Sequence, residues 1–358
     1  MRLKELADSA QVWCTAPGQD DDVVLWTRVR IARNLAQRRF APGADDKELL
    51  MLRELMLKKL SRIPALRGAK KITLDAPDLF TKRLLGERRI IDFEGEPLQG
   101  VRRGALLAMP RETTSVLLNW HDHLRFMSAG PGFCAQELYD FLSNLDDAAG
   151  DALDYAWEEN FGWLSPTPES SGTAMRISML AHLPGLERSG RLGPALKAMS
   201  SMFMVCKPAD GQTQDSCGDF HIIESISPFG RPETALLEAA ARAARFLCAA
   251  EREARAWSFS QERATESEDE AWRAIGILQN ARSISCEEAL ARISSILYGL
   301  AAGINLPAEK QKLLRLLLRI KPAHVTLLCA PRKSSPAERD IVRAAIIRAA
   351  LSSQPKPQ

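Results

Sequence analysis

The stretch from Thr113 to Ala129, TTSVLLNWHDHLRFMSA, holds the pattern on which the fold assignment depends. Two apolar, β-rich runs, 113–120 and 123–129, lie on either side of a short polar turn. Runs of this kind, so close in the chain, pair as neighbouring antiparallel strands. Further β-rich runs at 172–184 and 219–227 predict a sheet-forming region between about residues 72 and 227.

Helical patterns flank this region on both sides. Apolar residues recur at helical spacing from about Asp46 to Arg62, and strong helix formers follow Pro232 as far as Trp257. The polar stretch from Ser258 to Asp269 has the composition of a linker. At least four further helices are expected after it, one of them starting at the capping-box pair Ser285 and Glu288. The order of patterns predicts an α+β part to about residue 259, followed by a helical domain.

Composition and charge narrow the class of protein. Of the 358 residues, 46% are apolar and 26% are charged, as in ordinary soluble globular proteins. A net charge of +3 is too small to argue for a nucleic acid or membrane partner. The seven cysteines include no C-x-x-C pair, which favours free thiols in a reducing compartment. No apolar run reaches the roughly 18 residues of a membrane span, so a cytoplasmic protein is expected.

The segment from Asn119 to Arg125, NWHDHLR, resembles the signature N-E-E-D-H-L-R of the ATP:guanido phosphotransferases. This family contains creatine kinases, arginine kinases and bacterial protein-arginine kinases. Other segments are similar to further motifs of the family, in the same order along the chain. They are 27–34, 165–176 and 176–184, and two segments that look like the C-terminal domain of the bacterial protein-arginine kinases, 320–324 and 338–344.

The resemblance implies a particular domain organisation. A guanido-kinase catalytic domain, an antiparallel sheet flanked by helices, would occupy residues 1–259, with a small helical N-terminal part to about residue 70. An all-α C-terminal domain would occupy residues 260–358 and serve dimerisation and phosphoarginine binding. The fold class expected is therefore α+β with a helical C-terminal domain.

The resemblance also implies a set of cations that hold ATP with its Mg²⁺. Phosphoryl transfer needs the phosphates held in line and their charge neutralised. Arginine suits this task, because its planar fork grips two phosphate oxygens and stays charged. Carried over position by position, these residues are Arg28, Arg30, Arg125 and Arg176, with Lys207 at the fifth position.

The acceptor side of the expected site departs from the family pattern. An arginine acceptor is protonated, with a pKa above about 12, so its attack requires carboxylates that orient it and help to remove a proton. The family supplies two glutamates, and the matching positions here are His121 and Gln212, beside the retained Asp122; a cysteine of the family is replaced by Ser165. Activity is therefore expected to be weak or lost. A substitute could come from His121 itself acting as a base, or from one of three carboxylates, Asp210, Asp215 and Glu169.

A pair of arginines near the C-terminus suggests a second anion site. Arg339 and Arg343 are four residues apart in a predicted helix, so their side chains share a face, with Asp340 beside them. In the bacterial protein-arginine kinases the matching R-D-x-x-R-A segment is associated with binding phosphoarginine. The alternative is a solvated basic helix face.

Three functions are compatible with these residues. The first is an ATP-dependent kinase of protein arginine, and the second is a pseudokinase that binds ATP and phosphoarginine-bearing proteins as a quality-control adaptor. The third is a metal-dependent enzyme that uses His121 and His123 with Asp122, although zinc needs three or four ligands and no further His/Cys cluster lies nearby, so no metal site is expected. The resemblance implies a homodimer, protein substrates, a zinc-binding activator and a Clp-type unfoldase as partners.

Overall fold

A computed structural model describes residues 3–91, 102–209, 217–226, 229–260, 263–329 and 334–352. Its centre is an eight-stranded sheet in which every neighbouring pair is antiparallel, with the order β2-β3-β4-β5-β1-β8-β10-β9. A separate hairpin is formed by β6 and β7. The strands are β1 (Val24–Arg33), β2 (Lys70–Leu74), β3 (Gly104–Ala108), β4 (Thr114–Leu118), β5 (Leu124–Pro131), β6 (Trp157–Glu158), β7 (Gly162–Trp163), β8 (Met175–His182), β9 (Met204–Pro208) and β10 (Phe220–Ser225).

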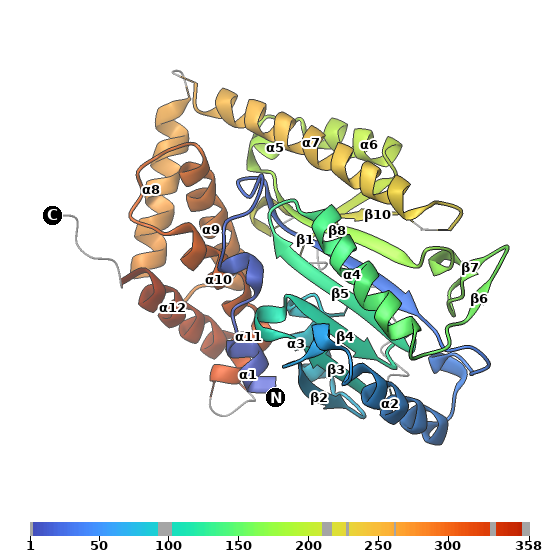
Figure 1. Cartoon of the computed structure of the whole chain (residues 1–358). Helices are drawn as coiled ribbons and strands as arrows, with labels where there is room; N and C mark the ends of the chain where they lie inside the picture. The colour runs from blue at the N-terminus through green and yellow to red at the C-terminus, as the bar shows by residue number, and fades with distance from the viewer. Residues whose placement is uncertain are drawn as a thin grey trace.

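Helices cover one face of the sheet and gather at one of its ends. In Figure 1, α4 lies across the central strands and α7 runs along the top of the view, while the C-terminal helices stand together on the left. The α+β architecture expected from the sequence, an antiparallel sheet flanked by helices with a helical C-terminal region, is confirmed. The helices are α1 (Leu3–Asp8), α2 (Asp46–Leu60), α3 (Leu79–Glu87), α4 (Ala135–Gly150), α5 (Pro184–Arg188), α6 (Leu192–Ser201), α7 (Glu233–Ser258), α8 (Ala264–Asn280), α9 (Cys286–Ala301), α10 (Lys310–Arg319), α11 (Pro322–Leu328) and α12 (Pro336–Ser352).

Local sequence signals account for several of these elements. The two runs around the polar turn form β4 and β5, which pair antiparallel with Leu118 opposite Leu124. At the start of α9 the Ser285 hydroxyl accepts a hydrogen bond from the Glu288 backbone N–H at 3.0 Å, as the capping pattern predicts. Gly303 follows that helix with a φ of +88°, a left-handed conformation that glycine adopts without strain.

The predicted linker from Ser258 to Asp269 is wrong in its second half, because α8 already begins at Ala264. The first two turns of this helix are mostly polar, and its buried apolar positions become regular only from Ala271 onward. The start of α8 was therefore not predicted, because its polar composition is also typical of a linker. Ser267 is nevertheless buried and donates a hydrogen bond to the Ser258 carbonyl at 3.0 Å, which ties α8 to the end of α7.

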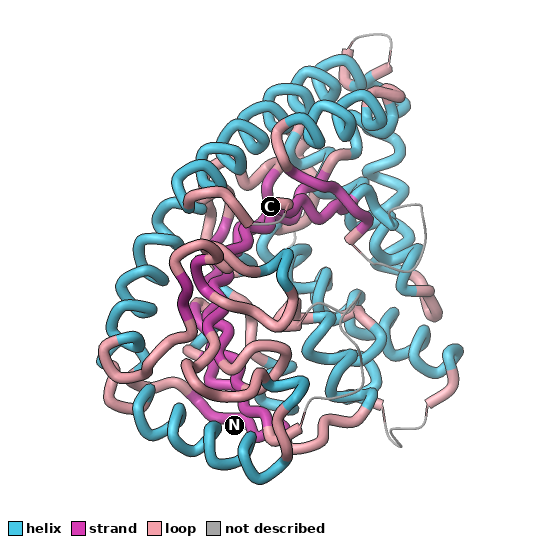
Figure 2. Tube along the Cα trace, turned by 90° about the vertical axis from the view of Figure 1, so that its right-hand side faces the viewer, coloured by secondary structure: helices cyan, strands magenta, loops and turns pink. Residues whose placement is uncertain are grey.

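The two faces of the sheet differ in chemistry. On β1, Val29 and Ile31 belong to a large apolar core that includes Leu142 of α4 and Leu237 of α7. Side chains alternate between the faces along a strand. Arg28 and Arg30, which alternate with Val29 and Ile31, therefore point to the opposite face, whereas Arg33 at the end of β1 pairs with Asp146 of α4. Figure 2 shows the strands as a band with helices along one side and a further group of helices on the other.

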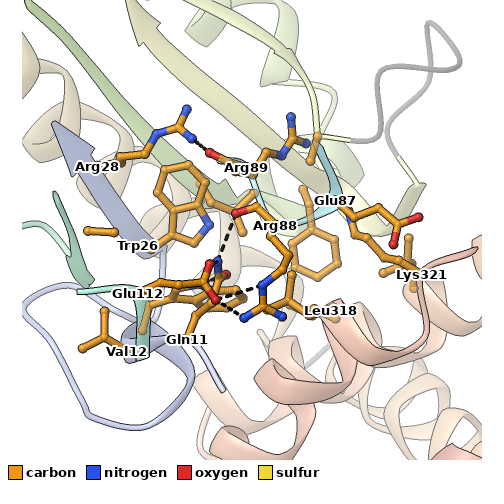
Figure 3. A pocket seen from close by; sticks show the side chains of 17 residues that line it. Gln11, Val12, Trp26, Arg28, Glu87, Arg88, Arg89, Glu112, Leu318 and Lys321 are labelled. Carbon is orange, nitrogen blue, oxygen red and sulfur yellow. Dashed lines mark hydrogen bonds and ion pairs between the residues drawn. The ribbon is translucent and has the colours of Figure 1, made fainter. Parts of the chain in front are cut away.

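A buried ionic network joins the N-terminal segment to the sheet region and the C-terminal helices. Arg88 is 2% exposed, and its Nε donates to the Glu112 carboxylate at 2.9 Å. Its Nη2 donates to the Ser9 carbonyl at 2.9 Å, and its Nη1 lies 3.2 Å from His324 Nε2. Gln11 completes the network by donating to Glu112 at 2.8 Å, as Figure 3 shows in part. Buried charges persist only when their hydrogen-bonding groups are satisfied in this way.

Glu87 connects the same network to α11. Its carboxylate accepts hydrogen bonds from the backbone N–H of Ala323 at 2.7 Å and of His324 at 3.2 Å. It also lies 2.7 Å from the His324 Nδ1. Burial lowers the pKa of His324, although its bond to Glu87 opposes that shift. A neutral ring that donates from Nδ1 to Glu87 and accepts at Nε2 from Arg88 satisfies both neighbours.

The composition predicted that no segment spans a membrane and that the cysteines are free thiols. In the part of the chain that the structure describes, no helix is both long and apolar enough to cross a membrane. All seven cysteines are free thiols. Burial raises the pKa of Cys134 and Cys206 to about 12, so these thiols are poor nucleophiles.

Candidate active site

Arginine side chains gather on the sheet face opposite to α4 and α7. Arg28 and Arg30 lie two residues apart on β1, so both side chains point to this face. On β8, Arg176 lies directly opposite Arg30, and on β5 the residue opposite Arg30 is Met127. Arg125 precedes Met127 by two residues and therefore shares the face. The register thus brings all four predicted phosphate-binding arginines together on three adjacent strands.

Lys207 lies on the same face but is paired with a carboxylate. Val205 of the edge strand β9 lies opposite Glu224 of β10, and Lys207 follows Val205 by two residues. The Lys207 Nζ is 3.2 Å from the Glu224 Oε2, and the Glu224 side chain is 8% exposed. Glu224 lies opposite Ser178, which itself lies opposite Arg28. A negative group therefore stands in the same row as the arginines.

Glu224 is a site residue that the sequence analysis missed. A charged residue inside the apolar run 219–227 was a signal that could have revealed it, because a buried charge in a strand requires a partner. The run alone could not identify that partner as Lys207, which lies on a different strand.

A pocket extends from Arg28 toward the C-terminal helices (Figure 3). The Arg28 Nε donates to the Ser178 Oγ at 3.3 Å, and its Nη1 donates to the Arg89 carbonyl. Aromatic and aliphatic walls beside a guanidinium suit a flat ring that carries anionic groups. The apolar residues of the lining are Val12, Trp13, Trp26, Ala129, Leu180, Ala209, Phe220, Leu290, Leu317 and Leu318.

The turn between β4 and β5 is fixed by Asn119. This residue has a φ of +49°, a conformation that asparagine tolerates better than most residues. Its Nδ2 donates to the carbonyls of Leu49 at 2.8 Å and Arg103 at 3.2 Å. Its backbone N–H donates to the His123 carbonyl at 3.1 Å. Asn119 therefore shapes the loop that carries the next residues of the motif.

Asp122 is buried and already bonded on several sides. Its carboxylate accepts hydrogen bonds from the Asn34 amide at 2.9 Å and the Ser165 hydroxyl at 3.1 Å. Its Oδ2 also lies 3.7 Å from the Arg125 Nη2. This arrangement suits Asp122 to hold the Arg125 side chain on its face, as a positioning residue.

His121 lies beside Asp122 at the expected acceptor side. Its Nε2 is 2.6 Å from the Thr167 Oγ1, and its side chain is half-buried. The structure therefore groups His121 and Asp122 with Ser165 and Thr167, at the end of the sheet where β1 ends and β5 begins. The other residues predicted for this side lie outside the described part: Gln212, Asp210 and Asp215, together with the side chain of Glu169.

His123 argues against the metal-dependent alternative. Its Nδ1 accepts a hydrogen bond from the Leu35 backbone N–H at 3.0 Å, and its Nε2 lies 3.0 Å from the Arg39 carbonyl. Both ring nitrogens are therefore engaged, and burial lowers the pKa of the ring. Within the ranges that the structure describes, no group of three or more His, Cys, Asp or Glu side chains is placed to hold a metal ion.

The C-terminal arginines have different surroundings from each other. Arg343 is 2% exposed, and its guanidinium donates to the carbonyls of Ile320 and Ile284, both at 2.8 Å, and to Asp340. Arg339 is half-buried and donates to the Ser334 carbonyl at 2.8 Å. The two arginines therefore do not present an equivalent pair to solvent, because Arg343 is committed to internal partners.

Comparison with known proteins identifies the class to which this fold and site belong. A family model described as ATP:guanido phosphotransferase, C-terminal catalytic domain, matches residues 54–254, and the chain belongs to that family. A second model, described as protein-arginine kinase McsB C-terminal domain, matches residues 264–358 and places the chain with the protein-arginine kinases.

Full-length relatives and solved structures agree with this assignment. The chain is 30% identical over 360 residues to a protein-arginine kinase from Pelotomaculum thermopropionicum, covering 99% of this chain and 100% of the relative. It is 31% identical over 365 residues to one from Symbiobacterium thermophilum, with coverage of 99% and 100%. A lombricine kinase structure matches at a TM-score of 0.56 and 14% identity, over 69% of this chain and 74% of the other. A duplicated taurocyamine kinase from Schistosoma mansoni matches at 0.54 and 17%, over 68% and 35%. These structural matches support the fold.

Proposed function

We propose that this protein transfers the γ-phosphoryl group of ATP to arginine side chains of proteins, and that the transfer is slow. The observation that carries the proposal is the register that places Arg28, Arg30, Arg125 and Arg176 on one face of three adjacent strands. Guanidinium groups on one face suit the phosphates of a nucleotide triphosphate, because each planar fork can grip two phosphate oxygens and stays charged.

The pocket beside Arg28 supports a place for the nucleotide base. Its walls include Trp26 and Phe220, which lie on the same sheet face as the arginines. With the base against these side chains, the phosphates would extend along β1 toward Arg30 and Arg176. Mg²⁺ would come with the nucleotide and neutralise charge on its phosphate oxygens. Arg125, held by Asp122, would contribute positive charge at the far end of this row.

The acceptor side explains why transfer should be slow. His121 and Ser165 stand where the family has a glutamate and a cysteine, and His121 is engaged with Thr167. Asp122 is a carboxylate in this group, but it already accepts hydrogen bonds from Asn34 and Ser165. Orientation and deprotonation of an arginine therefore depend on groups that perform both tasks poorly.

The C-terminal helices support a second site, for phosphoarginine. Arg343 holds Asp340 in place, because it bonds to the carboxylate and to two backbone carbonyls at once. Asp340 would then receive the guanidinium of a bound phosphoarginine, and Arg339 would meet its phosphate. Arg343 would act in this site as a positioning residue.

The alternative is a pseudokinase that binds nucleotide and phosphoarginine-bearing proteins without transferring phosphate. The pairing of Lys207 with Glu224 favours it, because this pair removes one positive charge from the phosphate-binding face. The homodimer, the zinc-binding activator and the Clp-type unfoldase remain predictions from the family under either function.

The deciding experiment is incubation of the purified protein with Mg-ATP and an unfolded, arginine-rich acceptor. Acid-labile phosphoarginine would be sought by mass spectrometry, with a His121→Ala variant in parallel and ATP binding measured by calorimetry. The proposed kinase yields phosphoarginine slowly. ATP binding without any phosphoarginine would overturn the kinase proposal in favour of the pseudokinase.

Replacing Glu224 by glutamine is expected to tighten Mg-ATP binding by about threefold to tenfold, which corresponds to about 1 kcal/mol. The change removes a negative group from the phosphate-binding face and releases the Lys207 ammonium to meet the nucleotide. Calorimetric titration would measure the affinity, with Glu238→Gln on the exposed face of α7 as the matched control. An unchanged or weaker affinity would show that Glu224 does not face the bound phosphates.

A further inference from the structure

The β6–β7 hairpin carries two aromatic side chains that face solvent. Trp157 is 56% exposed and Phe161 is 53% exposed, the highest values among the exposed aromatic residues in the part of the chain that the structure describes. A large aromatic side chain in water is unfavourable by itself. Rigid aromatic groups that stand out from a surface are typical anchors of protein recognition.

The base of this hairpin is firmly held. The Trp163 ring lies against the Arg33 guanidinium at 4.4 Å and meets the Tyr155 ring edge-on at 5.8 Å. Its backbone N–H donates to the Gly172 carbonyl at 2.9 Å. Gly162 has a φ of +70° and lies so close to Gly172 that an added Cβ would be 2.7 Å from its carbonyl oxygen. The exposed tip is therefore presented by a fixed scaffold, which lowers the entropy cost of binding.

The hairpin leads directly into the acceptor side of the candidate active site. Ser165 follows Trp163 by two residues and donates to Asp122 at 3.1 Å. Thr167 follows Ser165 by two residues and contacts His121 at 2.6 Å. A polypeptide that lies on the hairpin tip would thus be held at the side where an arginine must enter.

The charge of this segment selects the kind of polypeptide that fits. Residues 154–171 contain four acidic residues and no lysine or arginine, although the whole chain is slightly basic. Asp154 and Glu159 are exposed, and Glu158 is half-buried. Acidic side chains beside aromatic groups attract cationic, extended segments through charge and through contact of guanidinium groups with rings.

We propose that Trp157 and Phe161, with the acidic residues beside them, form the docking surface for the polypeptide that carries the acceptor arginine. The occupant is an extended, basic, arginine-containing segment of a protein. The identity of this occupant rests on the proposed function. Its binding can nevertheless be measured separately, because docking does not require phosphoryl transfer.

The test is binding of a fluorescein-labelled, unstructured peptide with one arginine and several lysines, followed by fluorescence anisotropy. The Trp157→Ser/Phe161→Ser variant is expected to bind it at least about tenfold more weakly than the unmodified protein, since each lost aromatic anchor removes a large contact. The Glu158→Gln/Glu159→Gln variant is expected to bind a few-fold more weakly, with a smaller salt dependence. The matched control is Trp272→Ser/Phe141→Ser, which removes one exposed tryptophan and one exposed phenylalanine from α8 and α4.

The experiment gives different results if the docking proposal is wrong and if the kinase proposal is wrong. If the peptide binds in a hairpin-dependent way but no phosphoarginine is formed, the docking surface is supported and only the proposed kinase activity is rejected. Phosphoarginine formation with the same KM for the acceptor in the hairpin variant as in the control variant overturns the docking surface and leaves the kinase. Equal peptide affinity in the two double-aromatic variants, or no peptide binding by the unmodified protein, also overturns it. Retained circular dichroism and Mg-ATP affinity show that a variant is folded.

Discussion

Restoring both glutamates, with His121→Glu and Gln212→Glu in one chain, is expected to raise the rate of arginine phosphorylation at least about a hundredfold. Two carboxylates would grip the N–H groups of the acceptor, align one nitrogen with the transfer axis and remove its proton. Thr167 can donate a hydrogen bond to the new carboxylate at position 121, since its hydroxyl already lies 2.6 Å from the His121 ring. The structural setting of position 121 therefore accommodates the change, whereas position 212 lies outside the described residues.

The measurement is phosphoarginine formed per minute on an unfolded acceptor, with Mg-ATP affinity determined for each variant. The His121→Gln/Gln212→Glu variant is the control, because glutamine has the shape of glutamate without its charge. A higher rate of phosphoarginine formation in the double-glutamate variant, but not in the control, would show that the negative charge at position 121 causes the increase. Equal rates in the unmodified and double-glutamate proteins, with ATP still bound, would mean that missing carboxylates do not limit transfer.

Replacing Arg88 by methionine is expected to lower the free energy of unfolding by about 3–5 kcal/mol, because it leaves the Glu112 carboxylate buried without its cation. Glu112 is 7% exposed and, among the described residues, would keep its contacts with Gln11 and Ser9. Urea denaturation followed by tryptophan fluorescence would measure the loss.

Two controls separate charge from packing in this experiment. Arg83→Met changes an exposed arginine of α3, the helix that ends just before Arg88, and should alter stability by less than about 0.5 kcal/mol. Arg88→Met combined with Glu112→Leu should recover much of the loss, because no unpaired charge then remains. A single Arg88 variant as stable as the unmodified protein would contradict the role given to this network.

Features of the structure that depend on residues close together in the sequence could be predicted, and features that depend on contacts between distant residues could not. The β4–β5 pair and the cap at Ser285 follow from residues within a few positions of one another, and both were predicted. The arginine face could also be anticipated, but only from the order of motifs, since periodicity does not reveal which strands become neighbours. The register then showed why Arg30 and Arg176, 146 positions apart in the printed sequence, lie opposite each other.

Features that depend on long-range contacts were not predictable in this way. The contact of His121 with Thr167 joins residues 46 positions apart, and the ion pair of Lys207 with Glu224 joins two neighbouring strands, β9 and β10. Arg343 looked like a ligand-binding residue from its place on a helix, because a helical pattern does not show which carbonyls lie within reach of a side chain. The burial of Arg343 became apparent only with the position of Ile320 and Ile284.

The network around Arg88 also bears on the order in which the chain can complete its structure during synthesis. Arg88 and His324 are separated by 236 positions, and both belong to a cluster that includes Ser9 and Gln11. A ribosome releases the N-terminal residues long before His324 emerges. Until then the Arg88 guanidinium lacks one of its partners and Glu87 lacks the helix start that it caps. The network around Arg88 is therefore complete only once α11 has been synthesised.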